Sequence, residues 1–338
     1  MNTAPKKKPA GCYWMAMVLL FVVLCVSMMM NFGLWLGKMA RTDRVVGITG
    51  RPVDQYPKFE TQWSFGDGDT VLVRIPLQGI IMRQVEGGLF MPQLDKVQIL
   101  LDRIRAAEND ERVRGIILEV DSPGGAVTPS DEIYHALVRF RESAEDRRVI
   151  VFTRDMAASG AYYAAMAGDW LIAEPTALVG SIGVMIQSLN WHELTDRIGL
   201  HDTTIKSGDT KDILNPFRPV DPDELGILQD LVDSMYARFA NIVQEGRGFD
   251  DAALEQIADG RIFSADEALE KGMIDAIGYW DDVVEQAAEV MGVPAVRIIR
   301  YERRPSFADW FAGVRTPLDW PSALSREQSP RMLYLWSP

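Results

Sequence analysis

The chain has 338 residues, of which 47% are hydrophobic and 25% are charged, and its formal net charge is −13. This length suits one or two globular domains with a sizeable core. The acidic balance argues against a nucleic-acid partner, because binding to phosphate requires a basic face. The two cysteines lie at one apolar segment, Cys12 at its leading edge and Cys25 in its middle, which excludes a disulfide framework in the rest of the chain.

That apolar segment covers residues 13–36 and contains no charged residue. It is longer than the roughly 20 residues that cross a bilayer core, and Trp14 and Trp35 suit the membrane interfaces. A cleaved signal peptide is the alternative, although its apolar core is usually shorter and is followed by a small-x-small site. We therefore expect a retained transmembrane helix in contact with membrane lipid.

Basic residues flank this segment on both sides, so the positive-inside count is close to a tie. Three lysines at 6–8 precede it, and Lys38, Arg41 and Arg44 follow it. A short N-terminal tail is easier to leave in the cytoplasm than to export. Residues 1–12 are therefore expected to be cytoplasmic, in a single-pass protein of the cell (inner) membrane whose folded domain lies on the extracytoplasmic side.

Strand and helix patterns alternate beyond a polar connector at 37–68. A strand is expected at 70–77, where apolar residues alternate, and apolar residues at helical spacing follow from Leu94 to Ile104. A short buried strand at 115–120 then ends on a Ser-Pro-Gly-Gly turn.

The alternation continues through the middle of the chain. A helix is expected over 130–141, and a strand at 149–152 leads into a serine turn followed by a helix rich in Ala and Tyr. Short apolar runs then occur at 170–173, 184–186 and near 203–205, and helical segments at 224–245, 252–258 and 265–271.

Strands that alternate with helices predict βαβ units and a largely parallel sheet. We therefore expect one α/β domain over residues 69–295. Residues 296–338 show no clear period, so their structure is not predicted. The last apolar residues of this tail could dock in a groove of the same chain or of a neighbouring subunit, or stay disordered.

A glycine pair after the strand at 115–120 carries the first chemical signal. The run is Ser122-Pro123-Gly124-Gly125. Paired glycines let a backbone approach a ligand and direct N–H groups at it, which in acyl transfer stabilises an oxyanion by about 3 kcal/mol per donor. A tight turn that needs glycine only for its conformation is the alternative.

Ser159 follows the strand at 149–152 and has only small residues next to it, which leave its hydroxyl uncovered. At the start of a helix, the N–H of Gly160 is free to join an oxyanion site. A plain helix N-cap is the alternative for any serine in this place. The chain has only three histidines, none of them where a serine hydrolase would need one, and Lys211 is the available base.

A solvated lysine is a poor base. With a reference pKa near 10.4, only about one lysine in 2,500 is neutral at pH 7. Burial against apolar walls would have to favour the neutral amine. A surface position is therefore the alternative for any lysine that is considered alone.

The sequence contains no metal cluster, phosphate loop or cofactor motif, so no cofactor is expected. Glu119 and Asp121 lie beside the glycine turn, where two lone carboxylates are usually structural. His135, His192 and His201 are interpreted as structural residues too.

Five runs within residues 71–283 occur in an order that resembles the bacterial signal peptide peptidases of the SppA type. This resemblance implies a fold of crotonase/Clp-protease-like repeated βαβ units and a Ser–Lys dyad in place of the histidine base of the Clp branch. The runs are Ile116–Gly125, Met156–Tyr163, Ala173–Val184, Lys206–Asp212 and Ala258–Phe263.

The resemblance implies a role for each matching residue. Ser159 corresponds to the nucleophile and Lys211 to the general base, and Lys206 is the competing lysine of the same run. Ser181 occupies the position of a hydroxyl that orients the lysine.

Glycines of the same runs correspond to the oxyanion site. Gly125 and Gly160 correspond to its donors, and Gly124 shapes the supporting turn. Crotonase relatives use similar glycine turns to bind acyl-CoA thioesters, but they lack the paired serine and lysine.

The resemblance also implies a membrane-anchored serine endopeptidase that degrades remnant signal peptides after preprotein processing. It implies a homo-oligomeric ring in which the lysine can reach the serine of a neighbouring subunit. Two alternatives stay open: a related membrane Ser–Lys protease that trims a specific membrane protein, and a scaffold that binds peptide without cutting it. Tyr162, Tyr163, Met185 and Ile186 are candidates for an apolar S1 pocket, with the core as the alternative.

Overall fold

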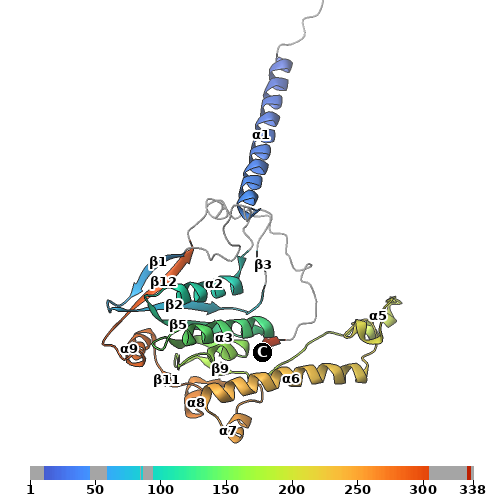
Figure 1. Ribbon diagram of the computed structural model, residues 1–338. Helices are drawn as coiled ribbons and strands as arrows, with labels where there is room; N and C mark the ends of the chain where they lie inside the picture. The colour runs from blue at the N-terminus through green and yellow to red at the C-terminus, as the bar shows by residue number, and fades with distance from the viewer. Residues whose placement is uncertain (1–10, 46–58, 84, 87–93, 304–332, 336–338) are drawn as a thin grey trace, which may run out of the picture. The chain divides into compact units, whose positions relative to one another are not determined.

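The computed structural model divides the chain into two compact units, Met1–Gln55 and Tyr56–Pro338. Figure 1 shows the elements and their order along the chain. The residues that the structure describes are 11–45, 59–83, 85–86, 94–303 and 333–335.

The second unit is built on a mixed sheet whose main series contains six parallel strands. The strand order along the sheet, with bounds, is β1 (Phe59–Phe65), β12 (Val296–Arg303), β2 (Thr70–Gln78), β5 (Val113–Ser122), β7 (Arg148–Ala158), β8 (Trp170–Ala173) and β11 (Ala276–Ile277). Only β1 is antiparallel to its neighbour in this series. At its far end, β7 also pairs with β9 (Leu178–Gly180), to which β10 (Ile262–Ser264) is antiparallel.

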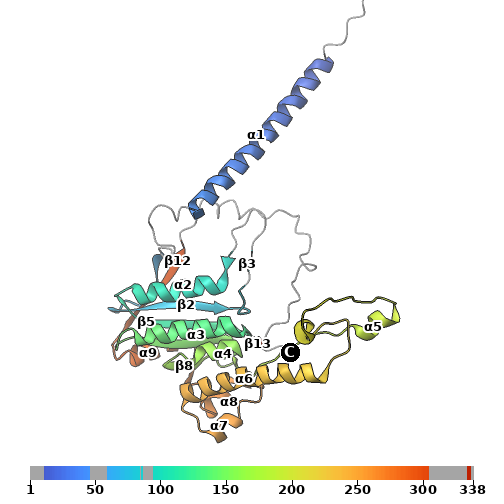
Figure 2. The same ribbon diagram turned by 45° about the vertical axis from the view of Figure 1, so that its right-hand side comes forward.

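Helices cover both faces of the sheet, as Figures 1 and 2 show. One hydrophobic cluster packs α2 (Lys96–Asn109), α3 (Val127–Glu142) and α4 (Gly160–Ala165) on one face. A second cluster packs α9 (Trp280–Val290) on the other face. Burial on both faces explains why β5 is apolar along most of its length, since neither face of the strand is exposed to solvent.

The longest helix of this unit is α6 (Pro222–Arg247). The Asp221 carboxylate accepts the N–H of Asp223 at its start, and Gly248 ends it with φ of 65°, a left-handed conformation that suits glycine. The remaining short elements are β3 (Val85–Glu86), β4 (Leu94–Asp95), β6 (Gly124–Ala126), α5 (His192–Arg197), the 3₁₀ turn Asp209–Asp212, α7 (Asp251–Glu255), α8 (Ala265–Glu270) and β13 (Leu333–Leu335).

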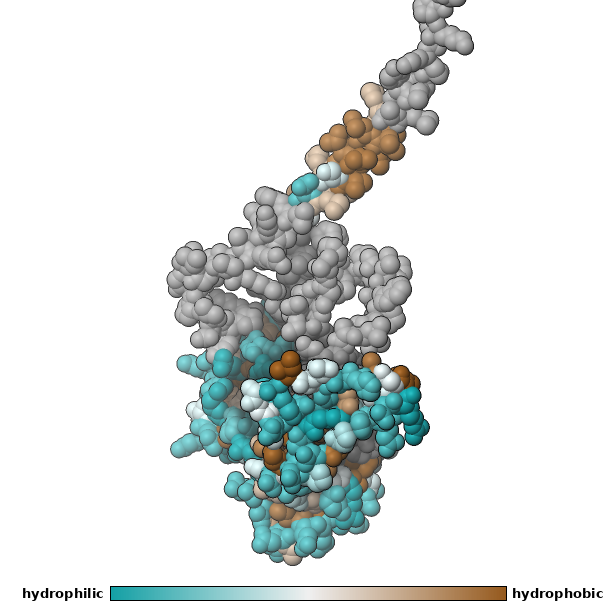
Figure 3. All heavy atoms as spheres, turned by 90° about the vertical axis from the view of Figure 1, so that its right-hand side faces the viewer, coloured by the Kyte–Doolittle hydropathy of each residue, from teal (hydrophilic) through white to brown (hydrophobic). Residues whose placement is uncertain are grey.

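The first unit contains α1 (Gly11–Val45), which includes the whole predicted apolar segment and extends past its end. The side chains described between 17 and 33 are exposed, and most are hydrophobic (Figure 3). Over the described part of the chain, no helix meets the length and apolarity that a membrane crossing requires.

Most predicted elements and the α/β class with a largely parallel sheet are confirmed. Two of the apolar runs, at 184–186 and 203–205, do not form strands; the first contains only a single β-bridge residue, Met185. The predicted connector at 37–68 contains the strand β1, and the predicted tail at 296–338 contains the strand β12. Both strands extend the sheet at one edge. The strand β1 has mostly exposed side chains, so its sequence carries little apolar alternation.

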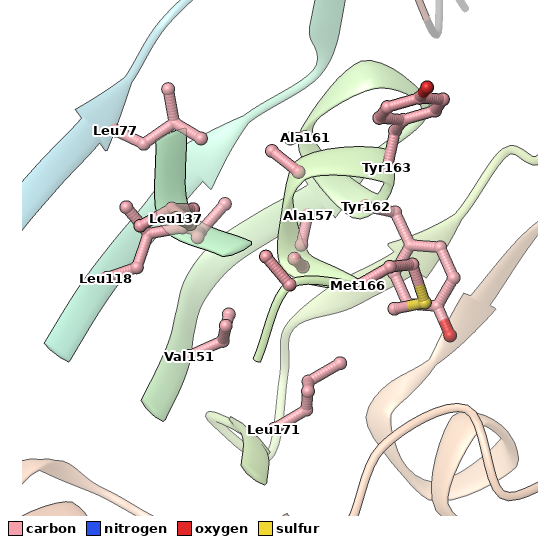
Figure 4. Packing of buried hydrophobic residues seen from close by; sticks show 14 of the residues in the cluster. Leu77, Leu118, Leu137, Val151, Ala157, Ala161, Tyr162, Tyr163, Met166 and Leu171 are labelled. Atoms are coloured by element: carbon pink, nitrogen blue, oxygen red, sulfur yellow. The ribbon is translucent and has the colours of Figure 1, made fainter. Parts of the chain in front are cut away.

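The main cluster surrounds α4, where Tyr162 and Tyr163 extend from the helix in different directions (Figure 4). Both tyrosines have 0% exposed surface. The expectation that they line an open S1 pocket is therefore wrong, and the alternative, a position in the core, is correct.

A buried ion network crosses the centre of the sheet. Glu119 of β5 accepts hydrogen bonds from Arg74 at 2.7 Å and from Arg154 at 2.6 Å, and its side chain is 6% exposed. Burial alone would raise the pKa of Glu119, but these two guanidinium groups outweigh it and lower the pKa. Arg74 also stacks on the Trp280 ring, 4.0 Å from its centroid. The interpretation of Glu119 as a structural carboxylate is confirmed.

We predict that Glu119→Gln lowers the free energy of unfolding by about 3 kcal/mol, because it leaves Arg74 buried without a carboxylate. Urea unfolding of the full chain measures this. The matched control is Glu193→Gln, which breaks an ion pair whose side chains are 77% and 88% exposed. The control should change stability by less than about 0.5 kcal/mol. Equal effects of both variants would contradict the assignment.

Candidate active site

Ser159 lies at the turn between β7 and α4, with φ of 54°. Positive φ is uncommon for a residue other than glycine and costs about 1–3 kcal/mol, so surrounding structure must hold it. The Ser159 N–H donates to the Gly180 carbonyl at 2.7 Å, and the Ser159 carbonyl accepts the Tyr163 N–H at 2.9 Å. The residue is only 1% exposed.

The hydroxyl of Ser159 makes no capping hydrogen bond to α4. The alternative reading as an ordinary N-cap is therefore not supported. Gly160 is the first residue of α4, where backbone N–H groups have no acceptor within the helix. The turn thus places an uncapped hydroxyl and a helix N-terminal N–H group beside each other. The expectation that small neighbours leave the hydroxyl uncovered is wrong for one chain, because the surrounding core buries Ser159.

Ser181 lies next to this turn. The strands β7 and β9 pair in parallel with Ala158 opposite Gly180, so the residues that follow them are neighbours. Ser181 also has positive φ, 52°, and its N–H donates to the Arg261 carbonyl at 2.7 Å. Among the described residues other than glycine, positive φ occurs only at Ser159, Ser181 and Leu214, so the strain is concentrated near the candidate nucleophile.

The glycine pair forms β6, directly after β5. Gly124 has φ of 93°, a conformation that favours glycine. Its carbonyl accepts the N–H of Ile81, and the N–H of Ala126 donates to the Ile81 carbonyl, both at 2.8 Å. A Cβ on Gly125 would lie 2.1 Å from the Ile81 oxygen, so a larger residue cannot fit there.

The backbone groups of Gly125 face the other edge of β6. Successive residues of a strand direct their N–H and C=O groups to opposite sides. Gly124 and Ala126 both form their hydrogen bonds with Ile81, on one side of β6. On the side of Gly125, β6 pairs with β13 in antiparallel register, with Tyr334 opposite Gly125. The predicted oxyanion donor is therefore on an edge where an extended chain segment binds.

The two glycine and serine turns come together because their strands are neighbours. In the register of β5 and β7, Ser122 lies opposite Ala157, so the segments that follow these two strands leave the sheet at the same end. The helix α4, which begins after Ser159, also contacts β6. The structure thus brings Ser159, Gly160 and the strand of Gly125 into one region.

The lysine is not part of this cluster. Lys211 lies in the 3₁₀ turn Asp209–Asp212 and is exposed, and no hydrogen bond or ion pair among the described residues joins its amine to Ser159 or Ser181. Figures 1 and 2 show α5, which precedes this turn in the chain, apart from the sheet and beyond the N-terminal end of α6.

The competing lysine has a different environment. The Lys206 amine donates to the Asp212 carboxylate at 2.6 Å and to the Asp209 carbonyl at 2.6 Å. The hydrogen bond from Lys206, followed by that from Arg218, lowers the pKa of Asp212 to about 2. Lys206 is therefore held as the cation of an ion pair that orders the loop before Lys211.

Sequence reasoning missed a polar cluster behind the serine turn. The Tyr163 hydroxyl donates to the Asp131 carboxylate of α3 at 2.5 Å, and Arg238 of α6 donates to that carboxylate at 2.7 Å and to the tyrosine oxygen at 3.1 Å. Burial, then the hydrogen bond to Asp131, raises the pKa of Tyr163, so its hydroxyl stays protonated. The only signal in the sequence was the tyrosine pair after Ser159.

The pKa of Asp131 shifts in the opposite direction. Burial would raise it, but the hydrogen bonds from Tyr163 and Arg238 outweigh burial and lower the pKa. The hydrogen bond to Asp131 contributes most to raising the pKa of Arg238. One ionised cluster therefore joins α3, α4 and α6.

The remaining candidates do not enter the site. His135 lies on α3 near Arg238, with a side chain that is 61% exposed, while His192 is half-buried and His201 is exposed. Two surface cavities of 500 and 280 Å³ are lined by other residues, around Asp67 and α9 and around Arg74 and Arg103. Searched over the described residues, the chain has no cluster of ligands for a metal ion.

This arrangement supplies part of an acyl-transfer site. A serine hydroxyl at a strained turn, an N–H group at a helix start and an N–H group on a neighbouring edge are the parts that attack a carbonyl and stabilise its oxyanion. The candidate base, Lys211, does not lie at this site within one chain.

Comparison with known proteins agrees with this chemistry. Residues 141–294 match the model of peptidase family S49. "Putative signal peptide peptidase SppA" of Enterococcus faecium is 32% identical over 237 residues, which cover 70% of this chain and 68% of that protein. The chain belongs to peptidase family S49.

Other relatives support the same family. A protein of Methanocaldococcus jannaschii named as a protease is 32% identical over 214 residues, 63% of this chain and 68% of that protein. Protease 4 of Salmonella typhi is 30% identical over 207 residues, 61% of this chain but only 33% of that longer protein. This S49 chain is thus a serine-type peptidase with the ClpP/crotonase-like fold.

We predict that Tyr163→Phe lowers the free energy of unfolding by about 1.5–3 kcal/mol, because it removes a hydrogen bond to an ionised carboxylate whose side chain is 28% exposed. It should also slow the reaction of Ser159 with a fluorophosphonate, because α4 loses its polar attachment to α3 and α6. Thermal unfolding and labelling rates measure the two effects.

The control for this experiment is Tyr236→Phe. Its hydroxyl donates to the neutral carbonyl of Ala258 at 2.7 Å, on the same helix as Arg238. The control should cost about 1 kcal/mol and leave the labelling rate unchanged. Unchanged labelling in Tyr163→Phe would show that the cluster does not position the serine.

Proposed function

We propose that this S49 peptidase is a membrane-anchored serine endopeptidase in which Ser159 is the nucleophile and Lys211 the general base. The observation that carries this proposal is the position of Ser159, at a strained and buried turn beside the peptide-pairing edge of β6. An enzyme that acts on extended peptides needs such an edge, because main-chain hydrogen bonds then align the substrate with the nucleophile.

The reaction passes through an acyl-enzyme. The neutral Lys211 amine takes the proton of the Ser159 hydroxyl as its oxygen attacks the scissile carbonyl. The N–H groups of Gly125 and Gly160 hold the oxyanion. The lysine then protonates the leaving amine and activates the water that releases the acyl group. Ser181 is proposed to orient the lysine amine through its hydroxyl.

Lys211 is proposed to come from a second copy of the chain in a homo-oligomeric ring. Within one chain its amine is exposed, whereas Ser159 is 1% exposed. The segment 187–221, called the arm here, and the start of α6 expose many large apolar side chains, some visible among polar atoms in Figure 3. These residues are Leu189, Trp191, Leu194, Ile198, Leu200, Ile205, Phe217, Val220, Leu225, Ile227 and Leu231. Large exposed apolar surface marks interaction sites, and burial between copies would favour the neutral amine.

The substrates are proposed to be remnant signal peptides in the membrane, with the catalytic domain on the extracytoplasmic side of the inner membrane. The uncharged segment 13–36 supports an anchor, and a relative is named as a signal peptide peptidase. An anchor of this kind would hold the site close to apolar peptides that stay in the bilayer.

We predict that Ser159→Ala and Lys211→Ala each reduce hydrolysis of a labelled signal peptide by at least about 1,000-fold, because each removes one half of the dyad. The control is Lys206→Ala. Its amine already pairs with Asp212, so this variant should keep activity within about tenfold of the unmodified protein. Full turnover in purified Lys211→Ala would refute the assignment. Peptide binding without turnover in the unmodified protein would favour a scaffold.

We predict that Ser159→Ala and Lys211→Ala complement each other when they are co-expressed. If one copy supplies the lysine to the serine of another, random assembly restores about a quarter of the sites. Single-variant preparations, measured at the same total concentration, are the controls. If the dyad forms within one chain, the mixture stays inactive, which would exclude a shared site.

A further inference from the structure

The strands β2 and β12 separate towards their C-terminal ends, and the cavity of 280 Å³ lies between them (Figures 1 and 2 show the two strands). We propose that this cavity binds a phosphate group, as the free anion or as a monoester, through Arg103 and Arg300. None of its lining residues belongs to the proposed dyad or oxyanion site, so the binding of phosphate does not depend on the proposed function.

The sequence of β2 explains why the two strands separate. Their parallel pairing ends at Val73 opposite Ile299, although β2 goes on pairing with β5 and β12 with β1. Successive residues of a strand direct their backbone groups to opposite neighbours, and the Gly79 N–H donates to the Asp121 carbonyl of β5. Residue 76, three positions earlier, therefore faces β12, but Pro76 has no N–H group to donate.

The gap lets side chains from the two faces of the sheet meet. Arg103 belongs to α2, whose residues Leu100 and Ile104 pack in the main cluster. Arg74 extends from β2 to the opposite face, where it stacks on Trp280 of α9. Both arginines nevertheless line the same cavity. The cavity thus collects basic side chains that a continuous sheet would keep apart.

Two arginines of this cavity form no hydrogen bond or ion pair with any residue that the structure describes. One is Arg103, whose Nε is buried, and the other is Arg300, which is exposed. By contrast, Arg74 is already paired with Glu119. A buried guanidinium N–H without an acceptor is unfavourable, so a bound acceptor would stabilise this part of the sheet.

The electrostatic environment of Arg103 also favours an added anion. Burial lowers the pKa of Arg103, the nearby Glu302 carboxylate raises it in part, and Arg300 lowers it further. An arginine remains protonated even so, because its ordinary pKa is above 12. Glu119 already accepts hydrogen bonds from two other arginines. Two cations therefore face one available carboxylate, on a chain whose net charge is −13.

A phosphate group suits this cavity in geometry, charge and size. The guanidinium presents its N–H donors as a planar fork that matches phosphate oxygens. A phosphate monoester carries between one and two negative charges near neutral pH and has three strong acceptor oxygens, enough for two arginines. The cavity is smaller than the pockets that bind drug-sized ligands, so a small group fits it better. Ligands of α/β sheets also commonly bind at the carboxyl ends of strands, where this gap lies.

Calorimetric titration of the full chain with sodium phosphate, at constant ionic strength, tests the site. Arg103→Gln and Arg300→Gln should each weaken binding at least about tenfold, because each removes a charged hydrogen bond. Glu302→Gln should tighten binding about threefold, because it removes a neighbouring negative charge. The matched control is Arg297→Gln, on the same strand but outside the cavity, which should keep the affinity within about twofold. Equal affinity in all variants, or no binding by the unmodified chain, would overturn the inference.

Urea unfolding separates binding from a defect of the fold. Without phosphate, Arg103→Gln should be at least as stable as the unmodified chain, because it removes a buried charged donor. Phosphate at about ten times its Kd should lower the unfolding constant of the unmodified chain about elevenfold, and that of Arg103→Gln at most about twofold. Arg300→Gln repeats this comparison at an exposed position. Equal stabilisation of all three proteins would show only a general salt effect and would overturn the inference.

Two further ligands identify the source of the phosphate group. Tighter binding of glycerol 3-phosphate than of inorganic phosphate would support a monoester, such as that of a lipid headgroup, and equal binding would support the free anion. Acetate that binds as tightly as phosphate would overturn the assignment to phosphate. These measurements do not require peptidase activity, so an inactive protein with this site would refute the peptidase mechanism alone.

Discussion

The hydrogen bond from the Ser159 N–H to the Gly180 carbonyl is the constraint on which the site depends. It ties the strained end of β7 to β9 and so brings Ser159 next to Ser181, both with positive φ. Strain of this kind persists only where the surroundings fix it, and here a fully buried α4 and the pairing of two parallel strands do so. Burial of the core thus stabilises a backbone conformation at Ser159 that an isolated turn would not adopt.

The polar cluster of Asp131, Tyr163 and Arg238 extends this constraint to the rest of the machinery. Asp131 is on α3, which follows the strand of Gly125, and Tyr163 is on the helix that follows Ser159. Arg238 is on α6, which follows the arm of Lys211. A hydrogen-bonded polar network specifies one arrangement of the elements that it joins. The helices that follow the strand of Gly125, the Ser159 turn and the arm are therefore held in one arrangement.

The proposed supply of Lys211 by a second copy would give this peptidase a means of control. Under that proposal a free chain has no complete dyad, which would limit unwanted proteolysis before assembly. Recognition at the β6 edge, as proposed, would use main-chain groups and so tolerate many peptide sequences. That tolerance would suit apolar peptides of varied sequence.

Much of this site could be read from the sequence because its signals are local. Alternating and helical periods predicted the strands β2, β5 and β7 and the helices between them, and the run after β7 identified Ser159 as a serine at a helix start. Edge strands were missed, since the exposed side chains of β1 weaken the apolar pattern on which such a prediction relies.

The sequence by itself determined the α/β class, the order of the chemical runs and the residue types available for catalysis, because periodicity and spacing are properties of neighbours in the chain. Only the tertiary structure decided that the Gly180 carbonyl accepts a hydrogen bond from Ser159, that Lys206 forms an ion pair with Asp212, and that β13 pairs with Gly125. Those relations join residues that meet through sheet register and helix packing, and register depends on the burial of the whole sheet.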